Sequence, residues 1–179
     1  MRFILLSFLF LFSCTLPTPA VPRVYVFRDS TVFLEYYTGA SNPIDSSVVL
    51  REQIGQFAKT QLGVCYKYCS KDPAGGFDCS GFVNYVFNHF DIAVPRSSVE
   101  FTNLGKTISL AKARVGDLIL FTGTVPGKKI VGHIGIILSN ENGAIRFIHS
   151  SSGEVYGVTI TLLEDYYMSR FVKVISILK

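Results

Sequence analysis

The sequence has few histidines and cysteines, and therefore few candidates for catalysis or metal binding. Its 179 residues include three histidines and four cysteines. No ligand set with zinc-like spacing is evident, so we expect neither a metal nor a cofactor. Internal repeats, charge blocks and low-complexity segments are absent, and a net charge of +4 is too small to indicate nucleic-acid binding. The length and the 49% hydrophobic content suit one domain with a single core.

Long hydrophobic runs are also missing. The main run, Phe3–Phe12, follows Met1-Arg2 and has about ten residues, too few for a membrane-spanning helix. It predicts an export signal, residues 1–13, of the lipoprotein type, because Ser13-Cys14 resembles a bacterial processing box that leaves a lipidated Cys14. The alternative is ordinary cleavage after Ala20. We expect a membrane-anchored lipoprotein of the cell envelope that faces the periplasm, with the lipid on Cys14.

Residues 14–45 are predicted to form a tether and an N-terminal extension. The tether is rich in proline, and the extension contains two strand-like stretches, Val24–Phe27 and Thr31–Tyr37. Asp45 then caps a predicted helix that ends at Gly63. Residues 46–179 form the predicted catalytic domain.

The stretch around Cys79 places a thiol at the start of a helix. From Cys79 onward, apolar residues recur with the spacing of one helical face, at Phe82, Val83, Val86, Phe87 and Phe90. Asp78 is a suitable N-cap, and the positive end of the helix dipole is expected to lower the pKa of the thiol. The alternative is that Cys79 is a small buried hydrophobic residue, so a catalytic role requires a partner base.

Two of the three histidines are suitable partners. His89 falls off the apolar stripe of the Cys79 helix and is set aside. His133 and His149 bound two apolar runs that a turn centred on Glu141 would join as a β-hairpin. That turn makes the two histidines directly opposite neighbours. Their face of the hairpin is apolar, and we expect it to pack on the Cys79 helix.

Several ordered blocks resemble the NlpC family of papain-like cell-wall cysteine peptidases, between Ser46 and Lys179. The blocks are Leu62–Tyr66, Phe77–Phe82, Val94–Ser98, Gly116–Phe121, Gly132–Ile136 and Phe147–Ser151. The resemblance implies that Cys79 is the nucleophile, His133 the base and His149 the residue that orients the base. A thiol, an imidazole and an orienting polar group are the parts that such catalysis needs.

The resemblance also implies substrate contacts. Tyr66 would hold the substrate or the oxyanion, and Asp78 and Ser80 would contact the free end of the peptide. In the block Val94–Ser98, Arg96 is expected either to meet a substrate carboxylate or to be a solvated surface group, and Ser97 is a further candidate contact.

The chain departs from the family pattern beside Tyr66. The family usually continues with Trp-Gly-Gly, whereas this chain has Tyr68-Cys69-Ser70, and Cys65 replaces a proline. Cys65 and Cys69 are expected either to form a short disulfide or to stay as free thiols.

The expected fold is α+β and papain-like, with N-terminal helices and the Cys79 helix packed on an antiparallel sheet of roughly five to six strands. The expected function is a peptidoglycan stem-peptide endopeptidase, a monomer with no nucleic-acid partner, which cleaves between D-glutamate and a diamino acid through a thioester. The alternatives are a cross-link endopeptidase or an N-acetylmuramoyl-L-alanine amidase with the same site, or a non-catalytic, lipid-anchored wall-binding protein.

Overall fold

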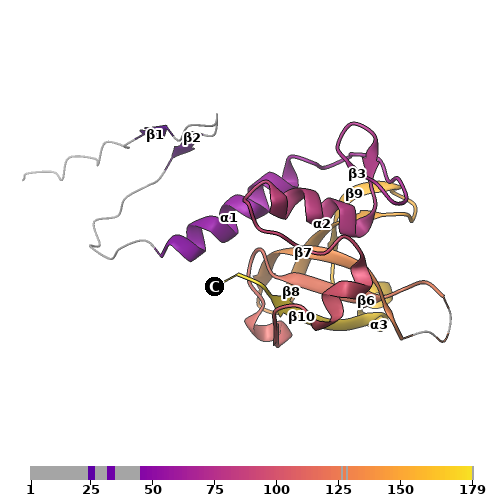
Figure 1. Ribbon diagram of the computed structural model, residues 1–179. Helices are drawn as coiled ribbons and strands as arrows, with labels where there is room; N and C mark the ends of the chain where they lie inside the picture. Colours follow the sequence, from indigo (N-terminus) through magenta and orange to yellow (C-terminus); the bar gives the residue numbers. More distant parts are fainter. Residues whose placement is uncertain (1–23, 27–31, 35–44, 126, 128, 179) are drawn as a thin grey trace, which may run out of the picture. The chain divides into compact units, whose positions relative to one another are not determined.

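The computed structural model describes residues 24–26, 32–34, 45–125, 127 and 129–178 (Figure 1). The predicted export signal, Cys14 and most of the tether lie outside the described residues. The chain divides into two compact units, Met1–Pro43 and Ile44–Lys179. In the first unit, β1 (Val24–Val26) and β2 (Val32–Leu34) pair antiparallel, as the two strand-like stretches indicated.

The second unit begins with a capped helix. The side chain of Asp45 accepts a hydrogen bond from the backbone N–H of Ser47 at 2.9 Å, which confirms the predicted N-cap of α1 (Ser46–Lys59). The other helices are α2 (Cys79–Asn88), α3 (Asp165–Ser169) and the 3-10 turns η1 (Ser98–Asn103) and η2 (Leu110–Lys112). The first helix ends earlier than expected, because the chain turns at 60–63 and leaves Leu62 exposed.

A six-stranded antiparallel sheet forms the centre of this unit, in the order β5-β10-β6-β7-β8-β9. Its strands are β5 (Lys106–Ile108), β6 (Leu118–Thr122), β7 (Val131–Glu141), β8 (Ala144–Ser151), β9 (Gly157–Leu162) and β10 (Phe171–Ser176). The expected α+β architecture is confirmed. The short strands β5, β3 (Lys71–Asp72) and β4 (Gly76–Phe77) were not predicted, because two or three residues carry too little alternation to be recognised.

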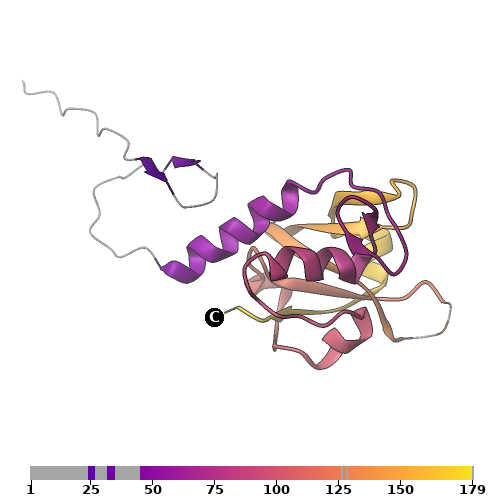
Figure 2. The ribbon, with the colours of Figure 1, turned by 45° about the horizontal axis from the view of Figure 1, so that its top comes forward.

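Both faces of the sheet are covered by apolar side chains. One face packs on α1 and α2 through Ile134, Ile136 and Ile148, and both views show these two helices on the same side of the sheet (Figure 2). The opposite face holds Ile137 and Phe147 in a second cluster. The face with Ile137 and Phe147 is the face of the hairpin on which both histidines were predicted to lie. The prediction that this face packs on the Cys79 helix was therefore wrong. Since both strands are apolar on both faces, alternation could not distinguish the two.

The hairpin of β7 and β8 has a tighter turn than expected. Glu141 pairs with Ala144 across Asn142 and Gly143, whose φ angles are 54° and 88°, as a two-residue hairpin loop requires. A bulge in β7 follows, and beyond it Ile136 lies opposite Ile148. Continuing this register places His149 opposite Gly135, so the two histidines are diagonal neighbours and not directly opposite. The predicted register was wrong by two residues, a shift that keeps both side chains on one face.

A buried ion pair fastens α1 to the sheet. Arg51 Nη1 lies 2.8 Å from Asp117 Oδ1, and the two side chains are 3% and 0% exposed. The same guanidinium donates to the hydroxyl of Ser176 and to the carbonyl oxygens of Val115 and Leu178. Arg51 therefore joins the first helix, the start of β6 and the end of β10.

No helix among the described residues is long and apolar enough to cross a membrane.

Candidate active site

The start of α2 holds Cys79 in a fixed backbone. Asp78 is the N-cap, and its Oδ1 accepts the backbone N–H of Gly81 at 2.6 Å, as the sequence predicted. The chain before the helix passes so close that a Cβ atom at Gly81 would overlap the carbonyl oxygen of Ser70. Only glycine fits there without movement of the backbone, which explains why Gly81 follows the cysteine by two positions.

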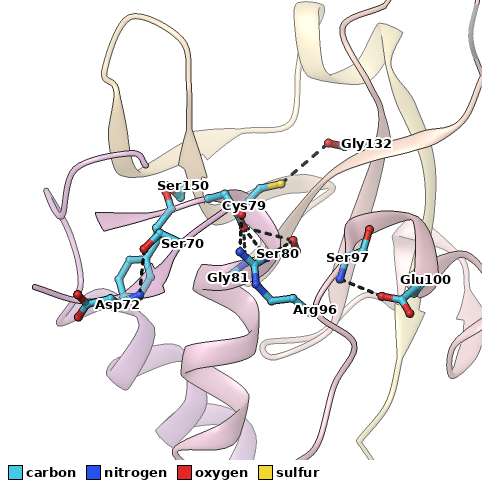
Figure 3. Close-up of polar contacts among 12 residues, drawn as sticks. Ser70, Asp72, Cys79, Ser80, Gly81, Arg96, Ser97, Glu100, Gly132 and Ser150 are labelled. Carbon is cyan, nitrogen blue, oxygen red and sulfur yellow. Dashed lines mark hydrogen bonds and ion pairs between the residues drawn. The ribbon is translucent and has the colours of Figure 1, made fainter. Parts of the chain in front are cut away.

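The sulfur of Cys79 points away from the polar groups at the helix start. Its Sγ lies 3.9 Å from the carbonyl oxygen of Gly132, the residue before His133, and Figure 3 shows Ser80 and Arg96 on the other side of the cysteine. Burial raises the pKa of the thiol to about 11, and the charge of Asp78 adds to this effect, against the opposing influence of nearby backbone N–H groups. The expectation of a lowered pKa was wrong, because burial and Asp78 outweigh the helix terminus.

His133 and His149 form a hydrogen-bonded pair. Nε2 of His133 lies 2.9 Å from Nδ1 of His149, and Nε2 of His149 lies 2.9 Å from Oγ1 of Thr161. Gly135 makes this diagonal contact possible, since a Cβ atom there would lie 2.7 Å from Phe147 Cδ2 and 3.3 Å from His149 Cβ. The three side chains form one line that leaves Nδ1 of His133 free to face another group.

Aromatic rings enclose the two imidazoles. Phe121, Phe147 and Tyr167 all have ring centroids within 6.0 Å of one or both histidine rings. Burial, with smaller contributions from His149 and Arg170, lowers the pKa of His133 well below its ordinary value. Burial and then the charge of Arg170 lower the pKa of His149 to about 3. Both imidazoles are therefore neutral at pH 7, as a proton acceptor must be.

The cysteine and both histidines line one cavity. The volume of this cavity is about 740 Å³, and its lining includes Tyr66. Burial and the nearby Cys79 raise the pKa of Tyr66, so its hydroxyl stays protonated and can donate a hydrogen bond. Thr124 and Gly132 also line the cavity, which places the loop between β6 and β7 at its border.

Three of the expected substrate contacts are bonded to one another. Arg96 donates from Nη1 to Asp78 Oδ1 at 2.9 Å and from Nη2 to Asp78 Oδ2 at 2.6 Å. It also donates to the hydroxyl of Ser80 at 3.1 Å. The carboxylate that was expected to meet the free end of a peptide therefore carries a bound guanidinium, and Arg96 already has a carboxylate partner.

Ser97 lies outside the lining of the cavity and precedes η1. Its backbone N–H donates to Glu100 Oε2 at 3.0 Å, which caps that turn (Figure 3). This position gives Ser97 a local structural role, and its contact with substrate stays a prediction.

Cys65 and Cys69 are free thiols and both are exposed. Of the two expected states, the structure therefore has the reduced one.

The ring of His89 stacks on Phe57 with centroids 3.7 Å apart, beside α1 and away from the cavity. Setting this histidine aside as a base agrees with its position.

Sequence reasoning missed Thr161, Tyr167 and Arg170, which all line the cavity of Cys79. Thr161 lies in β9, Tyr167 in α3 and Arg170 directly after α3, so all three follow the last predicted catalytic residue, His149. The alternation of β9 placed Thr161 on the face of His149, and this was the one signal that could have found it.

The part of the chain that contains Cys79, His133 and His149 is similar to a known family. The family model described as NlpC/P60 family matches residues 63–176. The chain belongs to the NlpC/P60 family. The match includes the cysteine, both histidines and Thr161, and it begins after α1, so the first helix and the N-terminal unit lie outside the part that defines the family.

Named relatives come from several bacteria. The chain is 30% identical over 167 residues to a protein of Haemophilus influenzae named "Probable endopeptidase", covering 90% of this chain and 87% of that one. It is 33% identical over 146 residues to "Gamma-DL-glutamyl hydrolase" of Bacillus subtilis, covering 80% of this chain and 33% of the other. A relative in Escherichia coli that is 37% identical over 98 residues is named "Murein DD-endopeptidase MepS/Murein LD-carboxypeptidase". The match covers 54% of this chain and 47% of that one.

Solved structures share the fold. An NlpC/P60 family protein from Bacillus cereus matches with a TM-score of 0.64 and 26% identity, over 72% of this chain and 40% of that chain. The peptidoglycan hydrolase RipB from Mycobacterium tuberculosis matches with a TM-score of 0.59 and 29% identity, over 82% of this chain and 74% of that chain. Among the sequence relatives, the chain spans a third of the Bacillus hydrolase and about half of the Escherichia enzyme.

Proposed function

We propose that this protein is a cell-wall cysteine endopeptidase that cleaves an amide bond in peptidoglycan stem peptides, between D-glutamate and a diamino acid. The observation that carries the proposal is the line from His133 through His149 to Thr161, beside Cys79 in one cavity. Membership in a family whose named members include peptidoglycan hydrolases supports the class of substrate. The relatives named for glutamyl hydrolysis support the choice of bond.

The two hydrogen bonds allow two sets of tautomers, and the mechanism requires one of them. If His149 Nε2 carries its proton and donates to Thr161 Oγ1, then His149 Nδ1 is an acceptor and His133 Nε2–H donates to it. Nδ1 of His133 is then unprotonated and able to take the thiol proton of Cys79. The opposite set of tautomers would put a proton on Nδ1 of His133 and remove the base. Thr161 thus takes part in the arrangement by accepting a hydrogen bond.

The first half of the reaction forms the thioester. His133 Nδ1 takes the proton of the thiol as the sulfur of Cys79 attacks the scissile carbonyl, because a thiol with a pKa of about 11 is protonated at pH 7. The tetrahedral oxyanion forms near the start of α2, where the helix N-terminus and the hydroxyl of Tyr66 can stabilise it. The C–N bond then breaks, and the leaving nitrogen receives the proton from His133.

The second half regenerates the enzyme. A water molecule gives a proton to Nδ1 of His133 and attacks the thioester carbonyl. The C–S bond breaks, the carboxylic acid product leaves, and the proton returns from the imidazole to the sulfur of Cys79. His149 keeps its proton at Nε2 throughout, so it holds the ring of His133 and stabilises the transient imidazolium without changing its own charge.

A digest of purified muropeptides, with products identified by mass, tests the proposed bond. We expect cleavage after D-glutamate by the wild type and none by Cys79→Ala, because the substitution removes the nucleophile and little else. Cleavage of cross-links or loss of stem peptides from the glycan would assign the protein to one of the two alternative enzymes. Turnover by Cys79→Ala at the wild-type rate contradicts the cysteine mechanism, and a wild type that binds wall without cleaving it is a wall-binding protein.

We further propose that a lipid on Cys14 attaches the protein to the membrane of the cell envelope. The support is the apolar run that stops at Ser13-Cys14 in the sequence. Two or more acyl chains are needed for stable attachment. Labelling with a fatty-acid analogue is expected to tag the wild type and not Cys14→Ala. An unlabelled protein that begins at Val21 would show cleavage after Ala20 instead.

A further inference from the structure

The cleft continues beyond the two histidines. A second cavity of about 620 Å³ lies next to the one that contains Cys79, and the linings of the two share Thr124, Tyr166 and Arg170. The second cavity is bordered by the loop after β6 and by the start of β10. A substrate longer than the reacting bond can therefore extend past His133 toward Arg170.

Arg170 is held rigidly where the two cavities meet. Its Nη1 donates to the hydroxyl of Tyr166 at 2.7 Å and its Nη2 donates to the carbonyl oxygen of Thr122 at 2.6 Å. The guanidinium carbon also lies 4.9 Å from the centroid of the Tyr166 ring. One N–H on each terminal nitrogen remains, so the guanidinium can donate further hydrogen bonds to a carboxylate.

The charge of Arg170 has no carboxylate partner among the described residues. The ion pairs in that part of the chain are those of Arg51 with Asp117 and of Arg96 with Asp78. In addition, Nε of Arg170 is buried and has no hydrogen-bond partner. A half-buried guanidinium bonded only to neutral oxygens leaves most of its charge uncompensated, and an anionic ligand would compensate it.

The second cavity is cationic as a whole. Its lining contains Arg170 and Lys129 and neither an aspartate nor a glutamate. The first cavity has one acidic residue in its lining, Glu154, which is exposed. The part of the cleft beyond the histidines therefore favours a negatively charged group over a neutral or positive one.

The chemistry decides which half of the substrate reaches this region. His133 has to deliver a proton to the leaving nitrogen, so the leaving half lies on the side of the imidazoles, and the acyl half lies toward Tyr66 and Asp78. We propose that Arg170 binds a carboxylate on the leaving half of the substrate, on the residue that follows the scissile amide. This inference rests on the proposed function and deepens it, because it states what the leaving residue must carry.

Matched peptides test the proposal on the wild-type protein. The substrate is L-Ala-γ-D-Glu-diaminopimelate, and it is compared with the two forms in which one or the other carboxylate of the leaving residue is a carboxamide. We expect one of the two amides to lower kcat/KM about tenfold or more, since a charge-assisted pair becomes a neutral contact. The identity of that amide shows which carboxylate Arg170 binds. Equal cleavage of all three peptides overturns the inference alone, whereas failure of all three to react overturns the proposed function and the inference with it.

Variants then assign the preference to Arg170. Arg170→Gln is expected to cleave the acid and the sensitive amide at similar rates, and the matched control Arg146→Gln, an exposed arginine outside both cavities, is expected to keep the wild-type ratio. A preference that persists in Arg170→Gln overturns the assignment. Should Arg170→Gln fail to fold, the wild type is measured from low to high salt. The carboxylate preference is expected to fall several-fold as an ion pair is screened, and a salt-independent preference overturns the proposal.

Discussion

The two faces of the central sheet are both apolar and buried, but one stabilises the fold and the other contains the candidate catalytic histidines. The face toward α1 and α2 is closed by Ile134, Ile136 and Ile148 and is fastened at one end by the ion pair of Arg51 with Asp117. The opposite face contains His133 and His149 among aromatic rings. A buried ion pair thus serves stability on the first face, whereas burial keeps the two imidazoles neutral on the second.

The largest effect is expected from the catalytic base. His133→Ala should lower kcat/KM by about 10²–10⁴, because proton transfer to and from a positioned side chain contributes a factor of this size. His149→Ala should lose less, since it removes the group that orients the base and not the base itself. Steady-state kinetics on a stem-peptide substrate check both, and thermal unfolding should show folded protein in each case. An equal or larger loss in His149→Ala would reverse the two assignments.

A change on the helix face should lower stability and leave catalysis intact. Arg51→Met is expected to cost about 3–5 kcal/mol, because it leaves Asp117 buried without its partner. The double change with Asp117→Leu should recover part of that loss, since no buried charge remains. Denaturant unfolding measures the free energy, and kcat/KM per folded molecule is expected to match the wild type. A large kinetic effect would show that the two faces are coupled.

Acid should destabilise the protein through its histidine face. The pKa of His149 falls from an ordinary 6.5 to about 3 in the folded state, and the pKa of His133 also falls well below 6.5. Between pH 6.5 and the lowered folded-state pKa values, these histidines bind more protons in the unfolded chain than in the folded one. The stability that the neutral histidines contribute is therefore fully present above pH 6.5 and is lost as the pH falls toward 3. The slope is at most about 1.4 kcal/mol per pH unit for each histidine.

His149→Asn tests that slope. The variant removes one of the two titrating groups and should therefore lose less stability than the wild type between pH 7 and pH 4.5, whatever its stability at pH 7. Denaturant midpoints at both values give the comparison. Equal losses in the two proteins would mean that carboxylates, and not His149, determine the acid sensitivity.

The smallest effect is expected from Thr161, a positioning residue. Thr161→Val keeps the shape and removes the hydroxyl that lies 2.9 Å from Nε2 of His149 and accepts from it in the proposed mechanism. This should lower kcat about tenfold with little change in KM, the cost of about one hydrogen bond. Thr161→Ser restores the hydroxyl and should regain most of the rate. If the serine and valine variants have the same kcat, the hydroxyl has no part in orienting the histidines.

Local patterns in the sequence determined the start of α1, the start of α2 and the class of the fold. Asp45 and Asp78 were recognisable as N-caps because capping depends on one side chain and the next few backbone N–H groups. The strands of the hairpin that contains His133 and His149 could be located from apolar runs separated by turn residues. The three candidate catalytic residues could be named from Cys79, from the small number of histidines and from the family blocks.

Only the tertiary structure decided how these residues meet. The bulge in β7 and the two-residue turn at Asn142 and Gly143 moved the hairpin by two positions, which no count from the middle of the loop could give. Burial and the carboxylate of Asp78 raise the pKa of Cys79 against the local effect of the backbone N–H groups at the helix start. Thr161 and Arg170 reach the cavity through sheet order and the packing of α3. The alternation of β9 gives the face of Thr161 but not its contact with His149, and no local pattern places Arg170, because both contacts depend on segments distant in sequence.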